Sequence, residues 1–143
     1  MAYGQWVSFT VRVKGFAGRA DLANLIWGKF YKYDDKDSEI DIAAVNNIKF
    51  ENNNTYSNII ASCGRSDAAS GTEGSFYICI DGKAPDDPDY KVCKISWDCP
   101  WGTKTNTFAA SDFDPDKYVV SIIGGSTYGG SIGMLTVVVA DIS

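Results

Sequence analysis

The sequence predicts an all-β protein, a single-domain antiparallel β-sandwich that spans residues 1–143. Three observations support this fold class. Short runs of β-branched and aromatic residues recur along the chain, their apolar residues alternate with polar ones, and clusters of Gly, Asn, Asp and Pro separate them. Many short strands with such turns are typical of a sandwich or barrel. A chain of 143 residues suits one domain.

The first expected strand, Trp6–Lys14, shows the alternation most clearly. Its apolar residues Val7, Phe9, Val11 and Val13 alternate with polar ones, as they do in a strand with one buried face. The later expected strands are shorter or less regular but are bounded by turn residues in the same way. In chain order they are Leu25–Tyr33, Tyr56–Cys63, Gly74–Ile80, Tyr90–Trp97, Phe108–Ala110, Tyr118–Ile123 and Met134–Ala140.

Polar segments between these runs are expected to be loops. Asp34–Glu39 has four acidic residues out of six, which predicts a solvated loop. Asp81–Asp89 contains two prolines and connects two strands of an expected hairpin. Asp112 begins a segment spaced like a calcium loop, but Lys117 and Ile123 stand where an EF-hand has its glycine and glutamate. We therefore expect no metal site there.

The composition argues against several functions. The chain has no histidine, so it cannot form a Ser–His–Asp or Cys–His catalytic group or a His-ligated zinc site. Its formal net charge of -5 opposes binding to nucleic acid and to anionic bilayers, but not to zwitterionic lipids. We expect no catalytic residues, no cofactor and no nucleic-acid partner, and therefore not an enzyme.

The four cysteines leave two interpretations open. Cys63, Cys79, Cys93 and Cys99 lack the CxxC spacing of a metal or redox motif. They could be small buried hydrophobic side chains. Alternatively, Cys79 and Cys93 could form a disulfide, because they lie on the two runs of the expected hairpin.

The most distinctive segment starts at Trp97 and reads Trp-Asp-Cys-Pro-Trp-Gly. Pro100 and Gly102 take the chain out of a strand, so Trp101 is expected at a loop tip. A large aromatic side chain there can enter the bilayer interface, and Lys104 can meet a phosphate as a point charge. The alternative is that both tryptophans cover the core.

Three blocks of sequence, with Trp27-Gly28-Lys29 between the first two, occur in the order found in a known family. They are MAYGQWV at 1–7, GRSDAASGTEGSF at 64–76 and WDCPWGTKTNT at 97–107. On these residues the chain resembles the aegerolysins, the ostreolysin and pleurotolysin A group. The blocks span about residues 1–108, and Trp-Asp-Cys-Pro-Trp-Gly is the most specific of them.

The resemblance implies a β-sandwich protein that recognises membrane sphingolipids of the sphingomyelin or ceramide phosphoethanolamine class, with or without a sterol. It also implies a partner with a membrane-attack-complex/perforin (MACPF) domain. The small protein docks on the lipid and recruits this partner, which forms the pore of a cytolytic toxin. Some bacterial pairs of this kind are insecticidal.

The resemblance places four residues at positions that line or border the lipid site of ostreolysin-like members: Trp6, Trp27, Trp101 and Lys104. Two positions depart from the pattern. Those members have a glutamate where this chain has Ser70 and a tyrosine where it has Ser96. A carboxylate and an aromatic ring suit a quaternary ammonium, so their loss argues against strong choline recognition. Glu73 or Tyr77 could compensate.

These residues give a docking hypothesis. Trp27 and Trp101 insert shallowly into the bilayer interface. Lys104, together with Arg65, meets the lipid phosphate. The hydroxyl groups of Ser66, Ser70 and Ser96 form hydrogen bonds with the head group.

Two other functions remain open: a lectin-like carbohydrate-binding sandwich, and a regulatory aegerolysin that is not lytic. No apolar run approaches the roughly 18–20 residues that span a bilayer, and the start lacks the basic and apolar regions of a signal peptide. We therefore expect a soluble protein that is released or secreted and acts at target-cell membranes.

Overall fold

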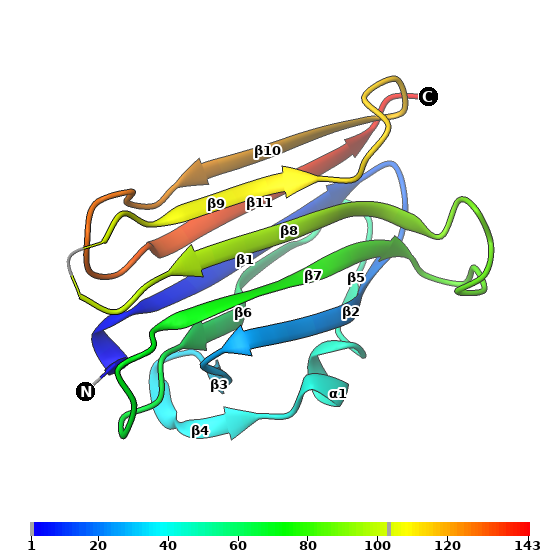
Figure 1. The fold of residues 1–143 in the computed structure, drawn as a ribbon. Coiled ribbons are helices and arrows are strands. Elements are labelled where there is room, and N and C mark those ends of the chain that lie inside the picture. The colour runs from blue at the N-terminus through cyan, green and yellow to red at the C-terminus, as the bar shows by residue number, and fades with distance from the viewer. Residues whose placement is uncertain (1, 103) are drawn as a thin grey trace.

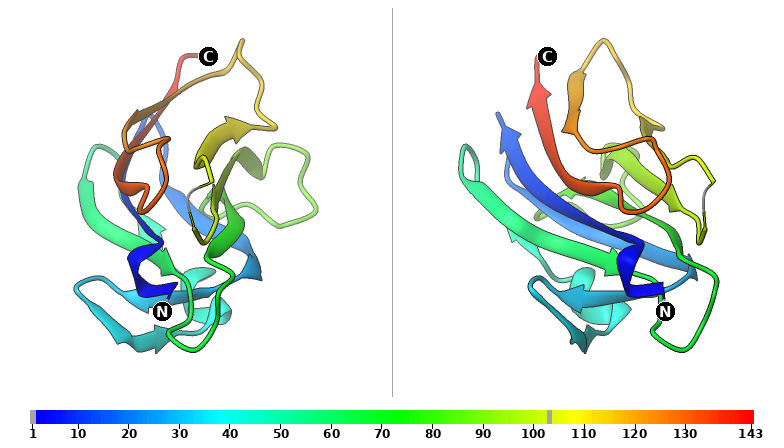
Figure 2. Two further views of the ribbon diagram at one scale, coloured as in Figure 1. Left: turned by 60° about the vertical axis from the view of Figure 1, so that its left-hand side comes forward. Right: turned by 90° about the vertical axis from the view of Figure 1, so that its left-hand side faces the viewer.

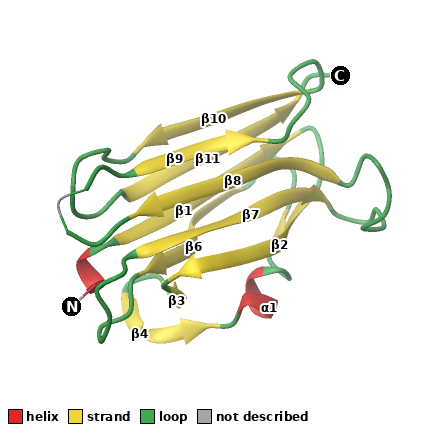
Figure 3. Ribbon diagram, in the orientation of Figure 1, coloured by secondary structure: helices red, strands yellow, loops and turns green. Residues whose placement is uncertain are grey.

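Two β-sheets packed face to face form the protein (Figures 1 and 2), so the expected all-β sandwich is confirmed. The structure, a computed structural model, describes residues 2–102 and 104–143. One sheet has six strands in the order β10-β11-β1-β6-β3-β4, and the other has five in the order β5-β2-β7-β8-β9. Strands dominate, and the described helices are a short 3-10 helix at Ala2–Gly4 and α1 at Ile42–Val45 (Figure 3).

The strands follow the apolar runs of the sequence, with small shifts at their ends. Their bounds are β1 Trp6–Lys14, β2 Gly18–Trp27, β3 Lys29–Lys32, β4 Asp35–Ile40, β5 Lys49–Phe50, β6 Thr55–Cys63, β7 Thr72–Ile80, β8 Lys91–Cys99, β9 Thr107–Ser111, β10 Tyr118–Gly124 and β11 Gly133–Asp141.

One pairing among the described strands departs from the antiparallel arrangement. Strand β11 lies parallel to β1, with Val7 opposite Gly133 and Lys14 opposite Ala140. The first and last strands are therefore neighbours inside the six-stranded sheet, and a parallel pair needs a long connection. Here almost the whole chain provides that connection, which local sequence patterns cannot reveal.

An aromatic cluster around Trp97 forms the centre of the core. The ring centroid of Trp97 lies 5.4 Å from that of Phe9, 6.0 Å from Phe30 and 6.2 Å from Phe76. Its indole N–H donates a hydrogen bond of 3.0 Å to the Thr72 hydroxyl. Both sheets supply these residues, so the cluster joins the two layers of the sandwich.

The expected strand Leu25–Tyr33 is two strands in different sheets. Strand β2 ends at Trp27, and β3 begins at Lys29 in the other sheet. Gly28 makes this corner with a φ of +90°, and a Cβ atom there would lie 2.5 Å from the Cys63 carbonyl oxygen. Only glycine fits both the conformation and the space.

The acidic segment Asp34–Glu39 is not a loop, so that prediction is wrong. Strand β4 covers most of it and pairs with β3 at the edge of the six-stranded sheet, with Tyr31 opposite Glu39. An edge strand has hydrogen bonds on one side only and tolerates charged residues, which also oppose unwanted pairing with other chains. The charges therefore mark a sheet edge here.

The possible disulfide between Cys79 and Cys93 is not formed, and all four cysteines are free and buried. A bulge places Cys93 opposite Ile78 and Cys79 opposite Lys91. Cys93 belongs to the central core cluster, whereas Cys79 is buried outside that cluster. Burial raises the pKa of each of these two thiols to about 12. The cysteines therefore act as small buried side chains with low reactivity.

Replacing Trp97 by alanine should lower the free energy of unfolding by about 3–5 kcal/mol, because it leaves a large cavity between the sheets. It also removes the indole N–H donor to Thr72. Urea denaturation followed by circular dichroism measures the change. Tyr128→Ala is the control, since that ring is 82% exposed, and it should change stability by less than about 0.5 kcal/mol. Equal urea midpoints for wild type and Trp97→Ala would contradict this role.

Candidate functional site

Two tryptophans and a lysine surround a hollow of about 560 Å³ at one end of the sandwich, which we call the indole hollow. The end of β2, the start of β7, the end of β8 and two loops position its walls. The lining residues are Trp27, Ala69, Ser70, Glu73, Asp98, Pro100, Trp101, Lys104 and Thr105. In Figure 1 these loops lie on the left, at the same end as the N-terminus.

The two indoles of this hollow are open to solvent. Trp27 is 54% exposed and Trp101 is 42% exposed, whereas Trp97 is only 2% exposed. Trp97 lies inside strand β8 and faces the core, while Pro100 ends the strand before Trp101. The idea that both tryptophans of this segment cover the core is therefore right for Trp97 and wrong for Trp101.

A close backbone contact brings Ser70 beside Trp101. Gly71 has a φ of +67°, and a Cβ atom there would lie 2.2 Å from the Cys99 carbonyl oxygen and 2.8 Å from the Trp101 nitrogen. Because Gly71 has no side chain, the loop before β7 can lie against the loop after β8. Two segments 30 residues apart in the sequence thus form one wall of the hollow.

Lys104 supplies a positive charge at the rim of the indole hollow. Its side chain is exposed and makes neither a hydrogen bond nor an ion pair with any residue that the structure describes. An ammonium group in this position can meet an anionic group of a ligand, such as a phosphate.

Two carboxylates face each other at the inner side of the hollow. Strand pairing places Trp27 opposite Glu73 and Glu73 opposite Asp98, so the three side chains form a row across β2, β7 and β8. Burial, and then the neighbouring Asp98, raise the pKa of Glu73 above its ordinary value. Like charges directly opposite each other in a sheet are destabilising. The sequence could have predicted that Asp98 faces outward, because it follows the inward-facing Trp97 in a strand.

The structure does not bring the other four predicted residues, Trp6, Arg65, Ser66 and Ser96, into the indole hollow. Ser96 lines a neighbouring hollow on the outer face of β8. Arg65 donates hydrogen bonds of 2.9 and 3.1 Å to the two carboxylate oxygens of Glu39, which lower the pKa of Glu39. Trp6 is half-buried beside Tyr33 in a third hollow.

Tyr128 is an exposed aromatic side chain that sequence reasoning missed. It is 82% exposed, on the loop between β10 and β11. The buried Asn106 side chain holds this loop by donating hydrogen bonds to the carbonyl oxygens of Ser126, Tyr128 and Gly130. Asn106 follows Lys104 closely in the sequence, so the loop that carries Tyr128 lies at the same end of the molecule as the indole hollow. Figure 1 shows this loop, between β10 and β11, on the left. In the sequence, Tyr128 stands in a glycine-rich turn between two strands, and nothing in that pattern indicates that its ring is exposed.

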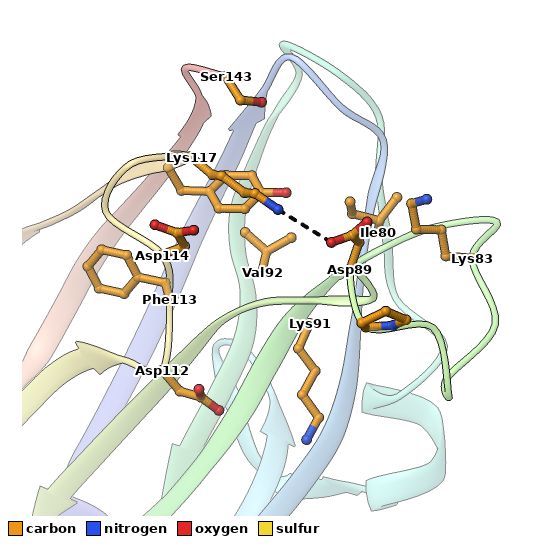
Figure 4. A pocket seen from close by; sticks show the side chains of 12 residues that line it. Ile80, Lys83, Asp89, Lys91, Val92, Asp112, Phe113, Asp114, Lys117 and Ser143 are labelled. Atoms are coloured by element: carbon orange, nitrogen blue, oxygen red, sulfur yellow. Dashed lines mark hydrogen bonds and ion pairs between the residues drawn. The ribbon is translucent and has the colours of Figure 1, made fainter.

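A larger hollow, of about 730 Å³ (Figure 4), is lined in part by the C-terminal Ser143. It therefore lies at the end of the sandwich opposite the indole hollow (Figure 1). Its charges are of both signs and partly pair with each other, since Lys117 lies 3.4 Å from Asp89. None of the predicted site residues lines it. Its rim lacks the exposed indoles that distinguish the indole hollow.

Within residues 2–102 and 104–143, no group of histidine, cysteine, aspartate and glutamate side chains has the arrangement of a metal site. No helix in the same residues has the length and apolar character needed to cross a membrane.

The fold and this surface define a β-sandwich protein with exposed indoles and an unpaired lysine at one end. Residues 4–142 match the sequence model of the aegerolysins, and the chain belongs to the aegerolysin family. Asp-hemolysin of Aspergillus fumigatus is 39% identical over 140 residues, covering 95% of this chain and 92% of that protein. Ostreolysin A6 of Pleurotus ostreatus is 36% identical, covering 96% and 95%.

The solved structures agree with this assignment. The crystal structure of RahU in complex with a Tris molecule superposes with a TM-score of 0.86 at 34% identity, covering 99% of this chain and 98% of RahU. IP-1A from Alcaligenes faecalis superposes with a TM-score of 0.83 at 34% identity, covering 99% and 94%.

Replacing Glu73 by glutamine should make stability less dependent on pH. The folded-state pKa of Glu73 is raised, so folding favours the protonated side chain. Its contribution to the free energy of unfolding is therefore complete below the ordinary pKa of 4.5, and it is lost as the pH rises through the folded-state pKa. Glu73→Gln should therefore be more stable than wild type at pH 7, by less than about 1 kcal/mol, and equal to it in acid.

Urea midpoints measured from pH 3 to pH 8 test this prediction. The control is Asp86→Asn, in the exposed loop between β7 and β8, which should run parallel to wild type. A constant difference between Glu73→Gln and wild type across the whole range would show that the carboxylate pair is not the cause.

Proposed function

We propose that this protein docks on membrane sphingolipids, of the sphingomyelin or ceramide phosphoethanolamine class, through the indole hollow. Bound to the membrane, it recruits a MACPF-domain partner that forms the pore, and it does so without catalysis. The observation that carries the proposal is the exposure of Trp27 and Trp101 beside Lys104 around one hollow.

The side chains of the hollow suit a membrane interface. Exposed indoles favour the interfacial region, where the ring is partly apolar and the N–H can remain hydrated. Lys104 meets the lipid phosphate, and the Ser70 hydroxyl adds a hydrogen bond. Tyr128 adds an aromatic ring at the same end of the molecule. A net charge of -5 directs this surface to zwitterionic bilayers rather than anionic ones.

Each contact contributes modestly, on the order of 1–3 kcal/mol for a well-buried aromatic side chain. Useful affinity therefore needs several contacts at once, or many protein copies on one membrane. The partner-recruiting role fits this requirement, because a bound layer of the small protein presents many copies to the partner.

The relatives are consistent with this proposal. One carries the name hemolysin, and RahU binds Tris, a hydroxylated amine. This chain has serines, Ser70 and Ser96, where ostreolysin-like members have a glutamate and a tyrosine. Glu73 and Asp98 are therefore the carboxylates that remain at the site. With fewer aromatic rings to surround a quaternary ammonium, we expect sphingomyelin to bind less strongly than ceramide phosphoethanolamine.

Vesicle flotation tests the docking role. Trp27→Ala, Trp101→Ala and Lys104→Ala should each weaken binding to phosphatidylcholine vesicles that contain ceramide phosphoethanolamine. The expected loss is about 5- to 100-fold for each tryptophan, since about 1.4 kcal/mol corresponds to a factor of ten. Lys83→Ala and Ile142→Ala, at the opposite end, are matched controls that should bind like wild type.

Undiminished binding of the Trp27→Ala, Trp101→Ala double variant would remove the indole hollow from the membrane contact. Dye release from the same vesicles tests the partner role. Release that needs an added MACPF-domain protein supports recruitment, whereas equal release by the small protein alone would contradict it.

A further inference from the structure

We infer that the hollow next to the indole hollow binds a neutral polyhydroxylated ring, of the hexose or inositol type. We call it the serine hollow and define it by Asn24, Glu73, Ser75, Ser96 and Asp98. The inference extends the proposed head-group site, but binding of a free ring does not depend on membrane docking.

The serine hollow has a volume of about 380 Å³ and lies on the outer face of the five-stranded sheet. Strand pairing places Asn24 opposite Ser75, Ser75 opposite Ser96, and Ser96 opposite Ala109. Alternate residues of a strand face the same side, so the adjacent row on this face holds Glu73 and Asp98. Small side chains in the middle row leave a depression between larger neighbours.

The polar groups of the serine hollow have unused hydrogen-bonding capacity. The side chains of Asn24, Glu73, Ser75 and Asp98 make no hydrogen bond with any residue that the structure describes. Ser96 has only a long contact of 3.4 Å to the Ala109 carbonyl oxygen. Because all five side chains are accessible to solvent, a ligand that both donates and accepts hydrogen bonds can replace the water around them.

A polyhydroxylated ring has the matching chemistry. Each carboxylate accepts hydrogen bonds from hydroxyl groups, and these charge-assisted bonds are the stronger kind. The Asn24 amide and the two serine hydroxyls can both donate and accept. Ile26, which is 56% exposed, flanks the hollow and offers apolar surface to the C–H face of a ring.

Charged ligands fit the serine hollow less well. The two carboxylates outnumber the one ammonium group of the hollow, that of Lys94, so they disfavour an anion. A quaternary ammonium needs open aromatic faces, and Trp97 in the floor is buried. A primary ammonium would pair with Glu73 and Asp98 but would leave the amide and the serine hydroxyls without partners. These alternatives become outcomes of the test.

The two hollows are adjacent, because Glu73 and Asp98 line both. A ring in the serine hollow therefore lies next to the place where Lys104 would hold a phosphate. Two sources could supply the ring: a soluble glycan, or a lipid whose phosphate carries inositol or a sugar. The shared chemistry is the hydroxylated ring, and separate arms of the experiment distinguish the sources.

Titration of ¹⁵N-labelled protein with myo-inositol and with methyl α-mannoside, followed by ¹H–¹⁵N spectra, tests the inference. Either ring should shift the amide signals of Asn24, Ser75 and Ser96. The double variant Ser75→Ala, Ser96→Ala should bind about tenfold more weakly, as expected for the loss of two hydrogen bonds. Ser96→Tyr should abolish binding by filling the depression.

Ser121→Ala on β10, in the other sheet, is the matched control and should bind like wild type. Ethanolamine and choline are titrated in parallel. The inference is overturned if neither ring shifts these three signals, if ethanolamine alone does, or if Ser96→Tyr binds the rings as wild type does.

Vesicles identify the source of the ring. If it belongs to a lipid, Asn24→Ala should bind at least about threefold more weakly to phosphatidylcholine vesicles that contain inositol phosphoceramide, and normally to those with ceramide phosphoethanolamine. Equal binding to both, together with the ring-dependent shifts, assigns the hollow to a soluble glycan. Trp101→Ala tests the docking proposal separately, since failure there leaves the ring titration unaffected.

Discussion

The burial of Trp97 between the two sheets is the constraint on which both hollows depend. Its ring contacts Phe9, Phe30 and Phe76, and its indole N–H bonds to Thr72, so the register of β8 is fixed against β7 and against the opposite sheet. Because side chains alternate along a strand, burying Trp97 turns its neighbours outward. A shift of one residue would bury the polar side chains that line the hollows and expose the indole.

The same constraint explains why one segment holds both a core tryptophan and an exposed one. Trp97 is inside the strand, and Trp101 follows after Pro100 has ended it. Trp97 is fixed in the core only four positions before Trp101, so it limits the conformations of the loop that carries Trp101. The exposed indole therefore extends from a rigid part of the fold, which would lower the entropy lost in the proposed membrane contact. Gly71 completes this rigid part by letting the neighbouring loop pack against the backbone.

Local patterns in the sequence predict most strands and the exposure of Trp101, because alternation and proline act over a few residues. Long-range features escape them. The parallel pairing of β1 and β11 joins the two ends of the chain, and β4 is an edge strand whose charges resemble a loop. Because the sequence predicts a loop where β4 lies, it does not predict that Glu39 in this strand pairs with Arg65. The resemblance gathers Trp27, Ser70, Trp101 and Lys104 as candidates, but only the structure shows them around one hollow.

The carboxylate pair is the least expected feature of the surface. Glu73 and Asp98 face each other across β7 and β8, although such a pair opposes folding. No described lysine forms an ion pair with either, even though Lys94 and Lys104 line the same two hollows. Local conflicts of this kind in natural proteins concentrate at functional sites. In the proposed function, the pair lies between the surface proposed to contact the bilayer interface and the surface proposed to bind hydroxyl groups, so it would be best placed to discriminate between lipid head groups.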